Sequence, residues 1–241
     1  MTAPHRGAAY SLRMGTLYLV RHGQASLGAD DYDKLSELGR RQSLRLGQYF
    51  AAKGLQFEAV LTGSLKRHAQ TWGHIQSGTA GGETTASALT PQIWTGLNEY
   101  DSEAVIACVH AGPHAKPVTP EAYRDHFRLL REGLRQWANG AVEPQGMPLY
   151  RDFVHGISAA LDHVRTQHSG NVLLVSSGGP IATAVAHILG SGAESFVELN
   201  MRIRNTAVSE FAFNPKRHSL LTFNTLPHLD APQLANWISY A

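Results

Sequence analysis

A short stretch of the sequence places an arginine, a histidine and a glycine directly after four apolar residues. The run Leu17-Tyr18-Leu19-Val20 leads into Arg21-His22-Gly23. A continuous apolar run bounded by polar residues is typical of a buried strand in a parallel sheet, and ligands in open α/β sheets bind beyond the carboxyl ends of the strands. We therefore expect Arg21 and His22 at the mouth of a site, where a guanidinium can bind an anion and an imidazole can act as a nucleophile.

A second apolar run ends in a glycine-rich turn. The strand expected over Val172–Ser176 leads into Ser177-Gly178-Gly179-Pro180, and a helix is expected from Pro180 to Ile188, closed by Gly190. Such a turn presents free backbone N–H groups and a helix N-terminus at the edge of the sheet. This arrangement is suited to binding phosphate.

A helix after the expected strand Ala59–Thr62 should bring a second arginine to the same edge. Ser64 can cap this helix, and Arg67 falls in its first turn. Because helical side chains lean toward the N-terminus, Arg67 can reach the edge that presents Arg21 and His22. The expected apolar face of the helix consists of Leu65, Ala69, Trp72 and Ile75.

The remaining patterns predict a three-layer α/β sandwich with a mainly parallel sheet and helices on both faces. Further helices are expected near 36–54, 119–140, 148–167 and 194–199, an edge strand near 91–94, and an antiparallel hairpin from strands 207–213 and 220–224. Ser36 and Thr119 are suitable N-caps, and Gly54 is a suitable helix end. The apolar face of the helix after Thr119 is expected to contain Tyr123, Phe127, Leu130, Leu134 and Trp137.

The sequence predicts a flexible tail followed by one domain. Residues 1–14 are small and polar, which predicts neither a signal peptide nor a membrane anchor. Residues 15–241 are expected to form a single α/β domain. Within it, prolines precede a strong helix and a Pro/Gly-containing loop follows it, so we interpret residues 101–147 as an inserted helical cap.

Composition and charge narrow the choice of partners. The chain has 241 residues, is 43% hydrophobic and carries a net charge of +2 without a long basic block, so neither nucleic acid nor a membrane is an expected partner. The single cysteine, Cys108, excludes an internal disulfide and favours a reducing, cytoplasmic location. His114 stands where a cysteine phosphatase would need arginine. A monomer or a homodimer is expected.

Four motifs in order, LVRHG, SLKRHAQT, LNEYD and SSGGP, resemble those of the histidine phosphatase superfamily, also called phosphoglycerate mutase-like proteins. The resemblance covers about residues 16–100 and 171–213. It implies a phosphatase that hydrolyses small phosphorylated metabolites without a metal or cofactor. One position departs from the family pattern: a second histidine is expected after the later strand, and Ser177 stands there.

The residue types also suit phosphoryl transfer, which needs an in-line nucleophile, positive donors around the equatorial oxygens and an acid for the leaving oxygen. His22 would be the nucleophile and would form a phosphohistidine, and Arg21 and Arg67 would hold the phosphate. Glu99 would protonate the departing alcohol and later activate water, if burial raises its pKa.

Several other residues share these candidate roles. Asp101 and Glu103 lie close to Glu99 in the sequence and are alternative acids. Gln24 is a candidate for a hydrogen bond to substrate, and Asn205 is a candidate either for supporting the site or for a turn.

The serine at position 177, in place of the expected second histidine, predicts weakened binding and activity. A hydroxyl gives a neutral hydrogen bond, about 1 kcal/mol weaker than a charge-assisted one, and losing an organised donor costs on the order of 10²-fold in rate. The N–H groups of Gly178 and Gly179 could compensate. Alternatively, one of three histidines could approach the turn: His68, His110 and His114.

Four other interpretations can be compared with the phosphatase. A phosphoglycerate mutase is the enzymatic alternative, but the loop QASLGADDYDKL lacks the Trp-Asn pair that mutases carry. A protein that binds phosphoesters without turnover is the non-enzymatic one. The nucleophile elbow of α/β-hydrolases is disfavoured because Val175 occupies its first glycine position. A metal site at His110 and His114 is disfavoured because Gly112 and Pro113 prevent a helix from aligning them.

Overall fold

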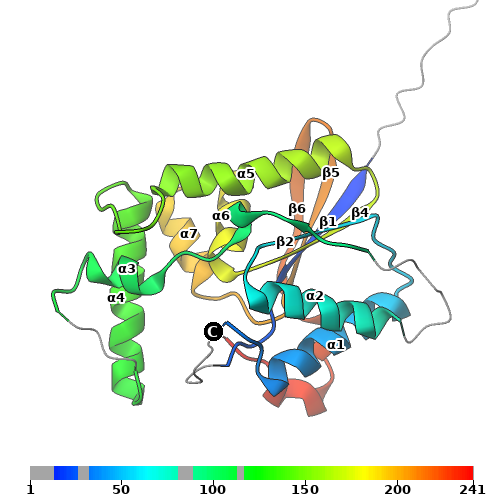
Figure 1. Cartoon of the computed structure of the whole chain (residues 1–241), viewed down its shortest axis with the longest axis horizontal. Coiled ribbons are helices and arrows are strands. Elements are labelled where there is room, and N and C mark those ends of the chain that lie inside the picture. The colour runs from blue at the N-terminus through cyan, green and yellow to red at the C-terminus, as the bar shows by residue number, and fades with distance from the viewer. Residues whose placement is uncertain (1–13, 27–32, 81–88, 113–116, 241) are drawn as a thin grey trace, which may run out of the picture.

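The chain folds around a six-stranded sheet (Figure 1). The structure is a computed structural model and describes residues 14–26, 33–80, 89–112 and 117–240. All of the expected tail except Met14 therefore lies outside the described residues. None of the helices in the described ranges is long and apolar enough to cross a membrane.

The sheet is mainly parallel, as expected. Its strands are β1 (Gly15–Arg21), β2 (Ala59–Thr62), β3 (Gln92–Ile93), β4 (Asn171–Ser176), β5 (Val208–Asn214) and β6 (Arg217–Thr225). They lie in the order β3-β2-β4-β1-β5-β6, with β3, β2, β4 and β1 parallel and the β5–β6 hairpin antiparallel. The parallel register pairs Arg21 with Ser176, so the two chemical motifs begin at the same edge of the sheet.

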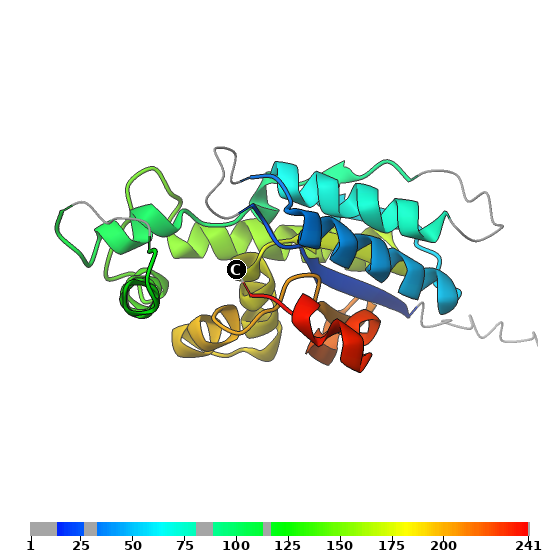
Figure 2. The ribbon, with the colours of Figure 1, turned by 90° about the horizontal axis from the view of Figure 1, so that it is seen from below.

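Helices cover both faces of this sheet. They are α1 (Glu37–Ala52), α2 (Lys66–Thr79), α3 (Ser102–Ala107), α4 (Pro120–Ala138), α5 (Tyr150–Gln167), α6 (Gly178–Leu189) and α7 (Ala193–Asn200), with short 3-10 helices at Thr95–Leu97, Pro227–Leu229 and Pro232–Trp237. Tyr18 and Val20 pack against α1 and α2, which run side by side (Figure 2), whereas Leu17 and Leu19 pack against α5 and α6. The alternation of strand side chains thus produces two cores.

Local signals placed several helix ends correctly. The Ser36 side chain caps α1 by accepting a hydrogen bond from the Gly39 N–H at 3.1 Å, and Gly54 follows the helix with a φ of +65°. Thr119 caps α4 in the same way, by accepting from the Ala122 N–H at 3.2 Å. The structure thus confirms these predictions. Such caps can be predicted from sequence because each depends on only a few neighbouring residues.

The predicted cap of α2 and part of its predicted buried face were wrong, whereas Trp72 and Ile75 are buried as expected. Ser64 does not cap this helix, because its hydroxyl accepts a hydrogen bond from the Asn98 amide at 2.8 Å. Instead, Asp33 accepts from the first helical N–H, that of Lys66, at 2.8 Å. Ala69 is exposed, and polar residues of α2, including Arg67 and His68, are buried at the sheet edge in its place.

Helices α3 and α4 lie together beside the sheet rather than over it (Figures 1 and 2). The short α3 had no counterpart in the sequence prediction. Trp137 and Leu134, near the end of α4, are fully buried, and the Trp137 ring lies 5.2 Å from that of Phe153 on α5. Phe127, expected on the same buried face, is 41% exposed, because the first half of α4 extends beyond the core.

Candidate active site

The ring of His22, the residue that follows β1, is held in one orientation. Its Nδ1 lies 2.7 Å from the backbone carbonyl oxygen of Gly23. Because a carbonyl only accepts, Nδ1 carries the ring proton and Nε2 keeps its lone pair. Arg67 donates its Nε–H to that Nε2 over 3.2 Å, and the His22 side chain is buried. The imidazole therefore presents an unprotonated nitrogen to a guanidinium.

The surroundings of His22 keep this ring neutral. Burial lowers the pKa of His22 well below its usual value, and the charges of Arg21 and Arg67 and the nearby His68 lower that pKa further. A neutral imidazole is the form that can attack an electrophile. The same two arginines can therefore bind an anion and keep the imidazole of His22 unprotonated.

Arg67 is positioned by a carboxylate that the sequence patterns did not single out as its partner. Its Nη1 lies 2.7 Å from Oδ1 of Asp33, whose Oδ2 accepts the Lys66 N–H. Asp33 thus fixes both the first turn of α2 and the guanidinium that projects from it. In the sequence, Asp33 is one of several acidic residues in a polar loop, so only the folded chain identifies this partner.

Arg21, the last residue of β1, lies beside the glycine turn. Its Nη1 donates to the carbonyl oxygen of Ile203 at 2.5 Å, and its side chain is buried. A Cβ atom at Gly178 would lie 3.9 Å from the guanidinium carbon of Arg21 and 3.8 Å from Oε2 of Glu99. The turn, an arginine and a carboxylate therefore meet at one point.

Glu99 is bound to the start of α6. Its Oε1 accepts the Gly179 N–H at 3.0 Å and the Tyr100 N–H at 3.3 Å. A Cβ at Gly179 would lie only 2.3 Å from that oxygen, so this approach requires glycine. Burial raises the pKa of Glu99, against the charges of Arg21 and the other groups, which lower it. The carboxyl is thus easier to protonate than an ordinary glutamate.

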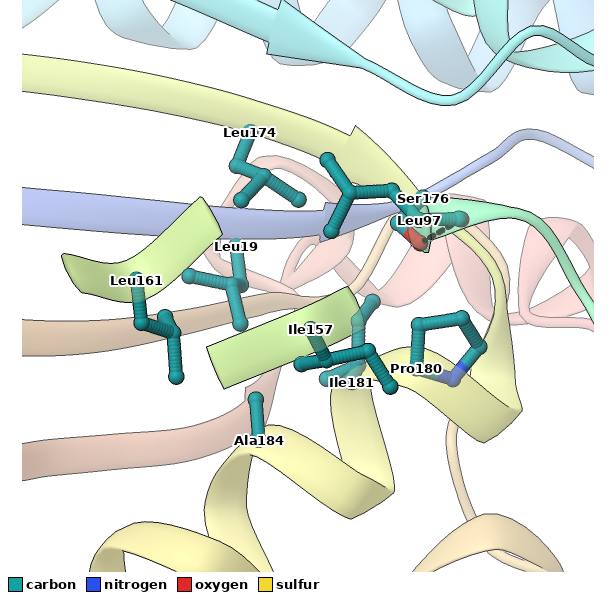
Figure 3. Close-up of a pocket in the computed structure, with 9 residues that line it drawn as sticks. All are labelled: Leu19, Leu97, Ile157, Leu161, Leu174, Ser176, Pro180, Ile181 and Ala184. Atoms are coloured by element: carbon teal, nitrogen blue, oxygen red, sulfur yellow. Dashed lines mark hydrogen bonds between the residues drawn. The ribbon is translucent and has the colours of Figure 1, made fainter. Parts of the chain in front are cut away.

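A buried hydrogen bond anchors the loop that carries Glu99 to the sheet. Ser176, the last residue of β4, donates its hydroxyl to the carbonyl oxygen of Leu97 at 2.6 Å (Figure 3). Apolar side chains from β1, β4, α5 and α6 pack around this contact, among them those of Leu19, Leu174, Ile157 and Ile181. The anchor holds Glu99 at the end of β4.

The structure separates Glu99 from the two neighbouring carboxylates. Asp101 is exposed and caps α3 by accepting from the N–H groups of Glu103 and Ala104 at 2.9 and 3.1 Å. Glu103 is also exposed, in the first turn of α3. Of the three, Glu99 is the one whose carboxylate contacts the turn at the start of α6.

Gln24 and Asn205 both lie near His22, but their side chains form hydrogen bonds with different groups. The side-chain oxygen of Gln24 accepts from the Ser36 hydroxyl at 2.8 Å, which places it at the start of α1. Asn205 donates its side-chain N–H to the carbonyl oxygen of His22 at 3.3 Å and is buried. Asn205 therefore supports the backbone of the candidate nucleophile.

Ser177 faces a histidine of α2. It occupies the N-cap position of α6 without capping it, and its hydroxyl oxygen lies 2.8 Å from Nε2 of His68. The sequence had left three histidines as candidates to approach this turn, and His68 is the one that does so. His110 follows α3 in the cap, and His114 lies outside the described residues.

The structure also shows the surroundings of Cys108 and tests for a metal site among the described residues. The Cys108 thiol donates to the Ala104 carbonyl oxygen at the end of α3. The described part of the chain contains no group of three histidine, cysteine or acidic side chains arranged to hold a metal ion.

Solved structures with similar folds handle phosphorylated molecules. Phosphoserine phosphatase from Entamoeba histolytica, with 3-phosphoglyceric acid bound, is 19% identical with a TM-score of 0.61 over 89% of this chain and 99% of that chain. Phosphoglycerate mutase from Bacillus anthracis str. Sterne is 17% identical, with a TM-score of 0.61 over 89% and 95%. A mycobacterial glucosyl-3-phosphoglycerate phosphatase with VO3 is 20% identical, with a TM-score of 0.62 over 88% and 99%. At these identities the likeness shows the fold.

The family follows from the sequence itself. No curated protein matches the chain significantly. A sequence model described as "Histidine phosphatase superfamily (branch 1)" matches residues 17–226, a span that contains His22, Arg67, Glu99 and Ser177. The match confirms the resemblance carried by the four motifs, and the chain belongs to the histidine phosphatase superfamily.

Proposed function

We propose that this protein hydrolyses phosphate monoesters through a phosphohistidine formed on Nε2 of His22. A small phosphorylated metabolite is the proposed substrate, because the similar solved proteins are described as acting on or binding such molecules. No metal or cofactor takes part in the proposed steps.

In the first step, Nε2 of His22 attacks phosphorus in line with the ester oxygen. The P–N bond forms as the P–O bond to the leaving group breaks, and Glu99 gives its proton to the departing alcohol. The guanidinium groups of Arg21 and Arg67 hold the equatorial oxygens. The phosphoryl group enters between His22 and Arg67 and replaces their 3.2 Å contact.

In the second step, water attacks the phosphohistidine. Glu99, now ionised, takes a proton from that water, the P–N bond breaks and inorganic phosphate leaves. The ring returns to its starting state, with the proton still on Nδ1. The raised pKa of Glu99 suits a group that must give and then take a proton.

The observation that carries this proposal is the set of contacts around the His22 ring. One nitrogen is fixed as a donor to the Gly23 carbonyl at 2.7 Å, and the other keeps its lone pair beside a guanidinium. A histidine that only filled the core would not need two buried arginines near it.

The test compares the wild-type protein with His22→Ala using p-nitrophenyl phosphate, without added metal. We expect phosphate release in the wild type and a loss of kcat on the order of 10⁴-fold or more in the variant. Acid quenching with labelled substrate should trap an acid-labile phosphoryl label that His22→Ala lacks. His187→Ala, an exposed histidine on α6, is the matched control and should retain full activity. Equal turnover in wild type and His22→Ala would reject the proposal.

The substrate class can be narrowed with a small panel. Phosphoserine, 3-phosphoglycerate and glucosyl 3-phosphoglycerate differ in the size of the group that must fit beside the cap. Release of inorganic phosphate identifies a phosphatase, whereas conversion between phosphoglycerate isomers without release identifies the mutase alternative.

A further inference from the structure

The pair formed by His68 and Ser177 is a buried polar contact that the proposed reaction does not yet use. His68 stands next to Arg67 in the first turn of α2, and Ser177 follows β4. Both side chains are fully buried, and Nε2 of His68 lies 2.8 Å from the serine hydroxyl oxygen. The rings of His68 and His22 have centroids 5.8 Å apart. The pair therefore lies directly beside the candidate nucleophile.

The direction of this hydrogen bond follows from the other nitrogen of the ring. Within the described residues, Nδ1 of His68 makes no hydrogen bond of regular geometry, although the backbone of Gly63 lies beside it and raises the pKa of the ring. A proton on that buried nitrogen would meet only a poorly aligned acceptor, which forfeits part of a hydrogen bond worth about 1 kcal/mol. The ring proton is therefore better placed on Nε2, from which it is donated to the Ser177 oxygen.

The ring of His68 carries one proton at neutral pH. Burial lowers the pKa of His68 to about 3, and the charge of Arg67 acts in the same direction. With its single proton on Nε2, the neutral ring fixes the Ser177 oxygen as an acceptor. The serine keeps its own proton, and this is the only side-chain contact of Ser177 within the described part of the chain.

We propose that His68 and Ser177 act as one unit, in which the Ser177 hydroxyl donates to the phosphoryl group held at His22 and His68 is the positioning residue that polarises and orients that hydroxyl. The relay runs from the His68 N–H to the serine oxygen and from the serine O–H to a phosphoryl oxygen, and such chains strengthen each member. This inference rests on the proposed function, because it assigns the donor that completes the same phosphate site.

The geometry also explains why the turn needs a donor from a side chain. The Gly179 N–H, which the sequence offered as a phosphate ligand, already donates to Glu99. The Ser177 hydroxyl, held by His68 at 2.8 Å, is a side-chain group of the turn that can take this role.

The test uses single and paired substitutions at the two positions. Ser177→Ala should lower kcat for p-nitrophenyl phosphate by about 10²-fold, the scale of losing one organised donor. His68→Ala should cause a similar loss, and the double variant should be no worse than Ser177→Ala, because the two residues act through one contact. His68→Gln, which can still present an N–H, should recover much of the activity. His74→Ala on the same helix is the control.

Moving the imidazole from position 68 to position 177 provides the stronger part of the test. Ser177→His alone should be damaging, because the new ring would overlap His68. Combining Ser177→His with His68→Ala moves the imidazole to the turn and should restore activity to within about 10-fold of wild type. Melting temperatures of all variants report whether they fold.

A binding measurement separates failure of this inference from failure of the proposed function. Titration with inorganic phosphate should show about 10-fold weaker binding for both Ser177→Ala and His68→Ala, even if no phosphoester is turned over. Full phosphate affinity and activity in a folded His68→Ala would overturn the positioning role. Loss of turnover in Ser177→Ala together with full turnover in His22→Ala would overturn both proposals and identify Ser177 as the nucleophile.

Discussion

Replacing Glu99 with glutamine removes an acid and leaves most of its contacts in place. The glutamine oxygen can still accept the Gly179 N–H that now lies 3.0 Å from Oε1. A positioned general acid contributes about 10²- to 10⁴-fold to the rate. The effect should be large for an alkyl phosphate, whose departing alkoxide must be protonated, and small for p-nitrophenyl phosphate, whose phenolate is a stable anion. We expect the rate of the first step, measured in a single turnover, to fall by about 10³-fold for the alkyl ester and about 10-fold for the aryl ester.

The pH dependence of Glu99→Gln gives a second readout. The protonated form of Glu99 is the donor, so wild-type kcat should fall as the pH rises through its pKa, which burial raises. At the acidic end, attack on phosphorus should fail when His22 becomes protonated, and the pKa of His22 lies well below its usual value. The alkaline decline should disappear in Glu99→Gln, measured with the alkyl ester.

The matched control is Glu103→Gln, an exposed glutamate in the first turn of α3. This variant should keep the wild-type rate and pH profile. Equal losses for the alkyl and aryl esters in Glu99→Gln, or an unchanged alkaline decline, would refute the role of Glu99 as the proton donor.

Two further perturbations follow from single contacts. Asp33→Asn removes the charge that holds Arg67 at 2.7 Å, so KM for p-nitrophenyl phosphate should rise by about 10-fold with a smaller change in kcat, and an unchanged KM would contradict the positioning role of Asp33. His228 is buried, and its pKa is lowered from 6.5 to about 3 in the folded chain, so the unfolded chain binds a proton first as the pH falls. Lowering the pH from 6.5 to about 5 should therefore reduce the free energy of unfolding by about 2 kcal/mol. His228→Gln should remove that loss in urea unfolding at the two pH values, and an equal loss in the variant would show that other groups cause it.

The features predicted correctly depend on short stretches of chain. The apolar run before Arg21 predicts a buried strand, and Ser36 and Thr119 predict helix starts, because a strand pattern or an N-cap involves only a few consecutive residues. The glycine turn at Gly178 is similarly local. These predictions were confirmed to within a few residues.

The errors arose where distant segments compete for the same groups. Ser64 is a suitable cap by type, yet Asn98 binds its hydroxyl and Asp33 caps α2 instead. Phe127 fits a helical apolar pattern, yet it is exposed because the buried part of α4 begins only at Leu129. Propensity cannot rank such alternatives, because their free energies depend on which segments meet.

The sequence by itself determined which residues could do chemistry and that they follow strands. Both can be predicted because a motif and a strand pattern each consist of consecutive residues. The sequence favoured Glu99 over Asp101 and Glu103 and left open which histidine approaches Ser177. The tertiary structure decided which side chains reach the turn: parallel pairing of β1 with β4 and the packing of α2 bring Glu99 to Gly179 and His68 to Ser177. Contacts over about eighty to one hundred residues are set by the packing of whole elements, which no short pattern encodes.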